Sequence, residues 1–400
     1  SSNCLFVDSP VMTGFSFQQA SSGAPASEEI EYTKTSRGAA QQVLQVLLQF
    51  LRVWPEYATA PYYVHGLSYG GNYVPRMAQA VLEHNSQSGP MINIKGIAAG
   101  DPCMDNKAQY PTYASTLYGM GVIMEDEREA VDRIMTNASA LNDVDCVASF
   151  NEWNRVWNDD WGFSCEPNCD FLFKAFTGSS NTENILLGAQ PANFDYFRRF
   201  LAKHLPEFHA QGMPRTNSTL SEGGMVYLSM VQSGDFCDAS APVYTTLFLE
   251  SSLDVMVYSS NLDPLIGPAS AAAGVRAAWD FADKHLTGGS AAKSAFYQQK
   301  KEIWRVAPMD VEPAGYARCL RLAASRFCYV VVRNAGHETT SYAPRAAYDL
   351  NQRFIRRQPF GGHALGVPDC AACGGAPPFA GSALPACQKG VHAKHEVVFM

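Results

Sequence analysis

The chain has 400 residues, of which 46% are hydrophobic and 12% aromatic, so it can bury a large core and is not a disordered protein. Its 30 Lys and Arg against 38 Asp and Glu give a net charge of −8, which argues against nucleic acid or an anionic membrane surface as a partner. No apolar run approaches the roughly 18 uninterrupted residues of a spanning helix, so we expect a chain that does not cross a membrane.

The first predicted element is an amphipathic helix from Arg37 to Arg52, which Pro55 would end. Its apolar residues recur at the spacing of one helical face: Val43, Leu44, Leu47, Leu48 and Leu51. The run Tyr62–Val64 then predicts a short strand, and a glycine-rich turn at 66–71 leads into a second helical pattern. The predicted order is strand, tight turn, helix.

Further apolar runs predict the other strands of the core. They cover residues 92–99, 253–258 and 327–332, and they are nearly continuous rather than alternating, as in strands that are covered on both faces. We therefore predict an α/β protein with a central, mostly parallel sheet flanked by helices.

Composition divides the chain into four regions. Residues 1–109 and 241–358 form the two parts of the predicted core. Residues 110–240 are charged, aromatic and irregular, and they predict a mostly helical insertion over the sheet. Residues 359–400 are rich in Gly, Ala, Pro and Cys without periodicity, and they predict a tail or strap outside the core.

The segment Gly66-Leu67-Ser68-Tyr69-Gly70 is a GxSxG pattern. In a nucleophile elbow, flanking glycines permit a sharp strand-to-helix turn that exposes the serine hydroxyl to substrate. The following helix and the Tyr69 N–H would then face a developing oxyanion. The alternative is a glycine-rich turn that only packs a strand against a helix, and the pattern alone does not decide between the two.

A serine nucleophile needs a base, and the base needs an orienting acid, so a triad requires both after later strands. Asp263 follows one apolar run by a short polar loop, whereas Asp254 precedes that run and would lie at the wrong edge of the sheet. His337 follows another run by small residues that let the imidazole turn back over the sheet. The order Ser68, Asp263, His337 is the one that α/β hydrolases use.

The remaining histidines lack this positional argument and are interpreted as surface or core residues, among them His65, His204 and His209. A cluster in the tail allows two interpretations, a zinc knuckle or a disulfide strap; it consists of Cys370, Cys373, Cys387, His392 and His395. We favour the strap, and we expect neither a metal nor a cofactor.

Cysteine usage indicates an oxidising compartment. The 11 cysteines are many and scattered, and their odd number predicts at least one free or intermolecular thiol. The sequons that begin at Asn137 and Asn217 agree with this compartment and predict glycosylation at both positions.

From about Cys4 to Ile355 the sequence resembles the serine carboxypeptidase family. LFVDSPVMTGFSF resembles the family's LFLDxPxGxGFSY, and FLRVWPEY followed by YYVHGLSYGGNYVP resembles FFxxFPEY followed by FYITGESYGGHYVP. Later in the chain, IKGIAAGDPCMD, VMVYSSNLD and VVRNAGHETTSYAPRAA resemble IKGIxIGNGxxD, VLIYSGDxD and VxxAGHMVPxxxPxxA.

This resemblance implies the α/β-hydrolase fold and assigns the roles of the site residues. Ser68 would be the nucleophile, His337 the general base and later acid, Asp263 its buried partner, and the Tyr69 N–H one oxyanion donor. The implied reaction releases C-terminal residues from peptides through an acyl-enzyme in an acidic lysosomal or vacuolar lumen, and the protein could equally be extracellular.

Three departures from the family pattern bear on the activity. Leu67 replaces a glutamate that helps to hold the terminal carboxylate of the substrate, and Glu338 replaces a methionine beside the histidine. With Gly66, these are the expected substrate-binding positions. The family's WNGGPGCSS loop, the source of the second oxyanion donor, has no equivalent in the sequence, and loss of one such donor typically costs on the order of 10²- to 10³-fold in rate.

We therefore expect a serine hydrolase with a peptide substrate. The alternatives are a catalytically weak or inactive subunit of a larger assembly, and an esterase or acyltransferase of the same fold. Because the family's first strands belong to the same sheet, a chain that starts at Ser1 should expose an apolar edge and aggregate. We expect the upstream portion to exist as a companion chain, or to have been cleaved or left unresolved.

Overall fold

The computed structural model describes residues 3–18, 31–87, 91–156, 172–179, 181–188, 203–204, 224–361 and 397–399. Within them, an eight-stranded sheet has the order β1-β8-β2-β3-β4-β7-β6-β5. Neighbouring strands from β1 to β7 are parallel, and β6 and β5 are antiparallel to their neighbours. The predicted central, mostly parallel sheet is confirmed. The strands are β1 (Asn3–Leu5), β2 (Tyr62–Leu67), β3 (Ile94–Gly100), β4 (Asp254–Ser260), β5 (Glu302–Trp304), β6 (Gly315–Arg321), β7 (Arg326–Val332) and β8 (Val397–Phe399).

The first helix, α1 (Ser36–Val53), begins and ends for local reasons. The Thr35 side chain accepts a hydrogen bond from the Gly38 N–H at 3.1 Å and so caps the helix. Pro55 follows its last turn, where a proline cannot continue the helix. The predicted helix is therefore confirmed, with one additional residue at each end.

Two apolar clusters cover the two faces of the sheet. On one face, strand residues pack against α1, α2 (Gly70–Asn85), α10 (Ala241–Leu249), α11 (Pro268–His285) and α12 (Gly289–Gln298). Trp279 is fully buried there, among the rings of Phe248, Phe296 and Phe327. On the other face, the strands pack against α14 (Pro344–Ile355) through Leu350 and Phe354. Both faces are covered, which explains why the strand sequences are continuously apolar.

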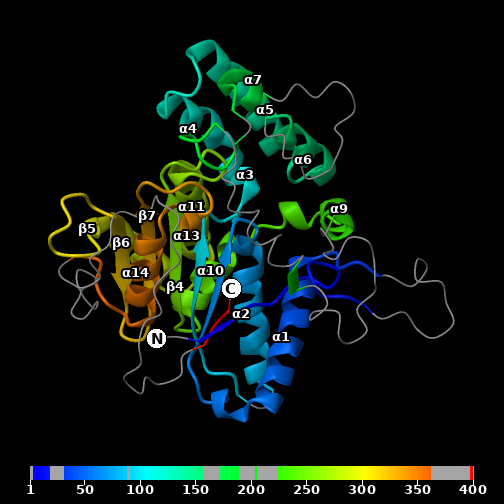
Figure 1. Ribbon diagram of the computed structural model, residues 1–400, viewed down its shortest axis with the longest axis vertical. Coiled ribbons are helices and arrows are strands. Elements are labelled where there is room, and N and C mark those ends of the chain that lie inside the picture. Colours follow the sequence, from blue (N-terminus) through cyan, green and yellow to red (C-terminus); the bar gives the residue numbers. More distant parts are fainter. Residues whose placement is uncertain are drawn as a thin grey trace.

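The described residues between β3 and β4 are mostly helical, and several of these helices gather at one end of the molecule beyond the sheet (Figure 1). The acidic residues 125–127 form the first turn of one of them, where the helix dipole favours negative charge. A disulfide joins Cys146 to Cys237 across this region. The helices are α3 (Asn106–Gln109), α4 (Tyr113–Gly119), α5 (Glu125–Leu141), α6 (Cys146–Asn154), α7 (Leu172–Thr177) and α9 (Gly224–Gln232), with short 3-10 helices η2 (Tyr110–Thr112) and η3 (Asp235–Cys237).

The end of the chain departs from the expectation of a tail wholly outside the core. Residues Val397–Phe399 form β8, which pairs with β1 on one side and β2 on the other. These residues are β-branched or aromatic, so they favour an extended strand. We expected an apolar edge of the sheet to be exposed, and in the structure β8 lines the edge of β2. The predicted cysteine and histidine cluster of the tail lies outside the described residues.

A second disulfide, Cys319–Cys328, joins directly opposed residues of β6 and β7, and Cys4 and Cys103 are free thiols. The two disulfides are consistent with an oxidising environment such as the secretory pathway. In the part of the chain that the structure describes, no helix has both the length and the apolar character required to cross a bilayer.

Candidate active site

The turn after β2 has the geometry of a nucleophile elbow. The Ser68 backbone is left-handed, with a φ of 58°, and α2 begins two residues later. Such a conformation is strained for a residue with a side chain, and it is typical of functional sites. The flanking glycine is required by packing, because a Cβ atom on Gly66 would lie 2.7 Å from the Val74 side chain.

Backbone hydrogen bonds hold this turn against the loop that follows β3. The Ser68 N–H donates to the Gly100 oxygen at 2.9 Å, and the Cys103 N–H donates to the Ser68 oxygen at 3.0 Å. Gly71 also lies against this loop, since a Cβ atom there would stand 2.4 Å from the Cys103 oxygen. The serine therefore has a fixed position at the carboxyl end of β2, with a half-buried side chain.

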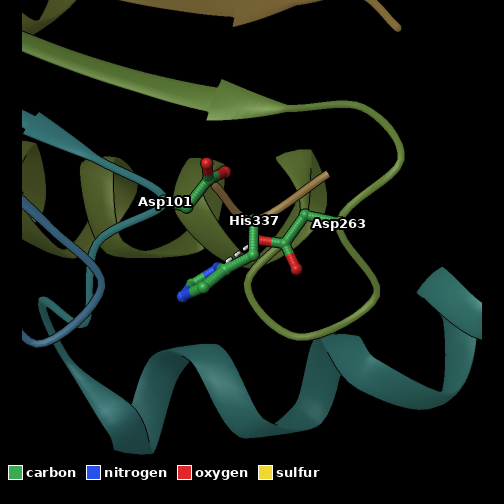
Figure 2. Close-up of side chains that lie close together, drawn as sticks. All are labelled: Asp101, Asp263 and His337. Carbon is green, nitrogen blue, oxygen red and sulfur yellow. Dashed lines mark hydrogen bonds and ion pairs between the residues drawn. The ribbon is translucent and has the colours of Figure 1, made fainter. Parts of the chain in front are cut away.

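His337 and Asp263 form a buried pair, joined by the dashed line in Figure 2. Imidazole Nδ1 lies 2.7 Å from Oδ2 of Asp263, and the exposed fractions are 5% for the histidine and 0% for the aspartate. The other carboxylate oxygen, Oδ1, accepts backbone hydrogen bonds from Leu265 at 2.7 Å and Ile266 at 3.1 Å. These donors stabilise an ionised carboxylate, which in turn favours a proton on Nδ1 and leaves Nε2 to exchange protons.

The electrostatic environment makes the imidazole more basic. Burial acts to lower the pKa of His337, but the charge and the hydrogen bond of Asp263 outweigh it and raise the pKa above its ordinary value. Burial raises the pKa of the neighbouring Glu338 carboxyl, and the charges of Glu183 and Asp263 act in the same direction. The site is therefore a concentration of carboxyl groups around the His337 imidazole.

The loop that carries His337 is anchored on both sides. The His337 N–H donates to the Glu183 backbone oxygen at 2.7 Å, and the Leu262 N–H donates to the Ala335 oxygen at 2.8 Å. Asn334 adopts a left-handed φ of 59°, and its N–H donates to the Asn261 side chain at 2.7 Å. The small residues of this segment thus permit a tight return over the sheet, as the sequence predicted.

Asp101 is a buried acidic residue of this site that the sequence reasoning missed. It follows β3 directly and lies beside the His337–Asp263 pair in Figure 2. Its two oxygens contact Ser260 and Thr339, and its exposed fraction is 0%. The sequence does hold one signal for Asp101: it directly follows a buried strand. The same signal identified Asp263 as the predicted partner of the histidine.

One ligand atom from each of Asp101, Asp263 and His337 lies within 4.8 Å of the others, a spacing that could accommodate a cation. However, both oxygens of each aspartate and Nδ1 of the histidine already take part in hydrogen bonds within the protein. We therefore interpret the cluster as a hydrogen-bonded network and not as a metal centre.

Tyr69, which follows the serine, is fixed by its side chain. Its hydroxyl donates to Oδ2 of Asp235 at 2.5 Å, and its ring stacks on Phe236 at a centroid distance of 4.4 Å. Oδ1 of the same aspartate accepts hydrogen bonds from the Ser36 N–H and hydroxyl. The backbone of Tyr69 is therefore held rigidly at the start of α2.

The structure brings some of the predicted residues into contact but not all of them. Asp263 and His337 are paired, while the described residues contain no hydrogen bond between the Ser68 hydroxyl and the imidazole. Gly66 and Leu67 end β2, and Glu338 is half-buried directly after the histidine. The catalytic and substrate-binding roles of these residues remain predictions.

The two predicted glycosylation sites have different status. Asn137 lies in α5 with an exposed side chain, whereas Asn217 lies outside the described residues. Among the other histidines, His65 is buried in β2, and its Nε2 has no hydrogen-bond partner within the described part of the chain.

Comparisons with known proteins agree with this geometry. The family described as serine carboxypeptidase matches residues 1–357. A probable serine carboxypeptidase, CPVL, from Homo sapiens is 28% identical over 353 residues, which cover 88% of this chain and 67% of the relative. The vitellogenic carboxypeptidase of Aedes aegypti is 29% identical over 361 residues, which cover 88% of this chain and 67% of the relative. The chain thus spans about two thirds of the length of these relatives.

A solved structure supports the fold. The crystal structure of KEX1(DELTA)P, a prohormone-processing carboxypeptidase from Saccharomyces cerevisiae, superimposes with a TM-score of 0.57 at 17% identity. The match covers 88% of this chain and 72% of that chain. The predicted α/β-hydrolase fold is confirmed.

Proposed function

Because this chain belongs to the serine carboxypeptidase family, we propose that it is a serine hydrolase that releases C-terminal residues from peptides through an acyl-enzyme. The observation that carries the proposal is the buried His337–Asp263 pair at the sheet edge where the strained Ser68 turn ends β2. Parallel strands bring their carboxyl ends to one edge of the sheet, and this arrangement supports a shared site for these residues from distant parts of the chain.

In the proposed reaction, Oγ of Ser68 attacks the carbonyl carbon of the scissile peptide bond while Nε2 of His337 takes the hydroxyl proton. Asp263 holds the Nδ1–H tautomer and stabilises the imidazolium that forms. The Tyr69 N–H donates to the oxyanion of the tetrahedral intermediate. The intermediate collapses as His337 passes its proton to the departing amine. Water then attacks the acyl-enzyme while His337 takes a proton from it, and His337 returns this proton to Oγ of Ser68 as the product leaves.

The proposal is tested by labelling with a fluorophosphonate, which reacts with an activated serine. We expect stoichiometric labelling at Ser68, no labelling of S68A, and a loss of about 10⁴-fold in labelling rate for D263N, because an Asn partner favours the wrong imidazole tautomer. Release of a C-terminal residue from an N-blocked dipeptide completes the test. An intact full-length protein that is neither labelled nor active would refute the proposal and favour an inactive subunit, which co-purifying polypeptides would then identify.

A second candidate, an esterase or acyltransferase, is favoured by Leu67 and Glu338. Leucine cannot donate to or accept from a terminal carboxylate, and the carboxyl groups of Glu338 and Glu183 near the imidazole would repel one. We expect the second candidate to hold if a blocked amino-acid ester is cleaved and the matching dipeptide with a free carboxylate is not. L67E should then increase turnover of the dipeptide relative to the ester.

We propose a lumenal or extracellular location, lysosome and vacuole included, and a glycan on Asn137. The exposed side chain of Asn137 and the disulfides support this proposal. A decrease in mass on enzymatic deglycosylation, absent in N137Q, tests the glycan. A companion chain with the upstream family loop is tested by mass analysis of all polypeptides in the purified native protein.

A further inference from the structure

We propose that Asp101 is a positioning residue of this site and that it acts as a neutral carboxylic acid, whose proton closes a ring of hydrogen bonds behind His337. This role in positioning the imidazole rests on the proposed hydrolase function, whereas the proton on Asp101 does not.

The geometry around Asp101 is a triangle of three oxygen atoms. Oδ2 of Asp101 lies 2.8 Å from Oγ of Ser260 and 3.2 Å from Oγ1 of Thr339, and the two hydroxyl oxygens are 2.7 Å apart. All three residues are buried, with exposed fractions of 0%, 0% and 1%. Every edge of the triangle is thus within hydrogen-bond distance and shielded from solvent.

Counting hydrogens in this triangle favours an acid. The two hydroxyl groups supply two hydrogens for three contacts, so an ionised Asp101 leaves one contact between oxygens without a hydrogen. A proton on Oδ2 supplies the third, and each oxygen then donates once and accepts once. The remaining oxygen, Oδ1, accepts from the Ser260 N–H at 2.6 Å in either protonation state.

The charges around the triangle act in the same direction. Burial raises the pKa of Asp101 well above its ordinary value, and the neighbouring Asp263 raises it further, although His337 and the Ser260 hydrogen bonds oppose them. When two carboxyl groups share a buried site, one of them keeps its proton. Asp263 is the better anion because it faces two backbone N–H donors and the imidazole.

The other titratable groups around the cluster do not compensate a second negative charge. Tyr258 of β4 and Tyr329 of β7 interact with Asp101 itself. The groups that interact with its neighbours Asp263 and His337 are Cys103, Glu338 and Glu183. Among the described groups that face this cluster, His337 is the cation, and it already pairs with Asp263. An ionised Asp101 would therefore be a buried charge without a partner of its own.

The ring connects Asp101 to the catalytic loop through Thr339. The Thr339 N–H donates to the backbone oxygen of His337 at 2.9 Å, so fixing the threonine also fixes the segment that carries the imidazole. A neutral acid provides this anchor without placing a second anion beside the ring. Two anions would hold His337 more strongly as imidazolium, which cannot accept the proton of Ser68.

The test compares the full-length wild type with D101N over pH 5 to 8. Asparagine has the same shape, supplies one donor and one acceptor without titrating, and tolerates the left-handed φ of 39° found at this position. A native acid whose pKa is raised holds a proton that the unfolded chain has lost, so wild-type stability must decline with rising pH relative to D101N. We expect the melting-temperature difference to fall by about 2 °C for each pH unit.

A melting-temperature difference that is independent of pH, or that grows in favour of the wild type as the pH rises, would overturn the proposal. Infrared spectroscopy provides a second measurement that does not need D101N. We expect the carbonyl band of a protonated carboxylic acid at neutral pH in the wild type, at a frequency that shifts in T339V because one partner is removed. A band that T339V leaves unchanged would contradict the ring.

Labelling of Ser68 in the same samples separates this proposal from the proposed function. If the wild type is not labelled but the pH dependence and the infrared band are as expected, the neutral acid stands and the hydrolase function fails. If the wild type is labelled and D101N keeps the pH dependence of the wild type, the hydrolase function stands and the neutral acid fails.

Discussion

Gly336 lies so close to Glu183 that a Cβ atom added to the glycine would stand 2.4 Å from the backbone oxygen of the glutamate. The imidazole of His337, the next residue, is therefore positioned by the segment 181–188 as well as by the sheet. This segment belongs to the mostly helical part of the chain between β3 and β4. This contact makes the site sensitive to the packing between the two parts of the chain.

The first prediction concerns this contact. G336A should push the loop of His337 away from residue 183, so we expect a destabilisation of about 1–3 kcal/mol and a large loss of fluorophosphonate labelling. G119A is a suitable control, because a Cβ atom at Gly119 has no heavy atom within 4 Å. Denaturant unfolding and labelling rates of both variants provide the measurement. Equal effects of the two substitutions would show that the close contact does not constrain the loop.

The second prediction follows from the pKa of His337, which the charge and the hydrogen bond of Asp263 raise above its ordinary value of 6.5. The folded protein then binds a proton that the unfolded chain loses above pH 6.5, so the contribution of His337 to stability is fully present below pH 6.5 and is lost as the pH rises through the raised pKa. We expect the wild type to exceed H337Q in free energy of unfolding by more at pH 6 than at pH 9. Urea unfolding at the two pH values measures this, and D263N should remove most of the difference.

The third prediction concerns acid stability. Burial lowers the pKa of His65 to about 4, and the ring packs against Phe354 at a centroid distance of 5.9 Å. The unfolded chain takes up a proton below pH 6.5 that the folded protein takes up only near pH 4, so stability is lost between these values as the pH falls. We expect H65L to abolish up to about 3 kcal/mol of this loss. Substitution of the exposed His285 by Asn should leave the acid sensitivity unchanged, and a parallel response of the two variants would contradict the assignment.

The fourth prediction ranks the two disulfides. Cys146–Cys237 closes 91 residues and Cys319–Cys328 closes 9, so the chain-entropy estimate gives about 5 and about 3 kcal/mol of stabilisation. We expect the double Ala variant at 146 and 237 to melt at the lower temperature. Calorimetry of the two double variants under oxidising conditions measures the order, and the reverse order would show that strand packing around β6 and β7 matters more than chain entropy.

Much of the fold was predictable from the sequence because its strands are short, continuously apolar and bounded by clear turns. The helix before Pro55 and the strand, turn and helix around Ser68 follow from spacing and from glycine and proline alone. Strand β8 was not predictable, because Val397–Phe399 is a three-residue run whose pairing depends on a partner about 335 residues earlier in the chain.

The site was predictable only in part. Asp263 and His337 were identified because each follows an apolar strand in the order that a triad requires, and the structure pairs them. Asp101 and Glu183 were not identified, because the importance of Asp101 comes from burial and from its contacts with Ser260 and Thr339, and that of Glu183 from its contact with the distant loop of His337. No local pattern distinguishes a carboxyl group that shares a buried site from one that faces water.

The strand order has a consequence for how this protein matures during synthesis. Strand β7 lies between β4 and β6, and the imidazole follows β7, so the serine turn emerges from the ribosome some 270 residues before the residue that would activate it. Until then β4 lacks its neighbour β7, and β2 lacks β8 for longer still, and such strand edges attract aggregation and chaperones. Under the proposed function, the nascent chain therefore lacks its general base until residue 337 has been made, and the strands that complete the sheet are synthesised late.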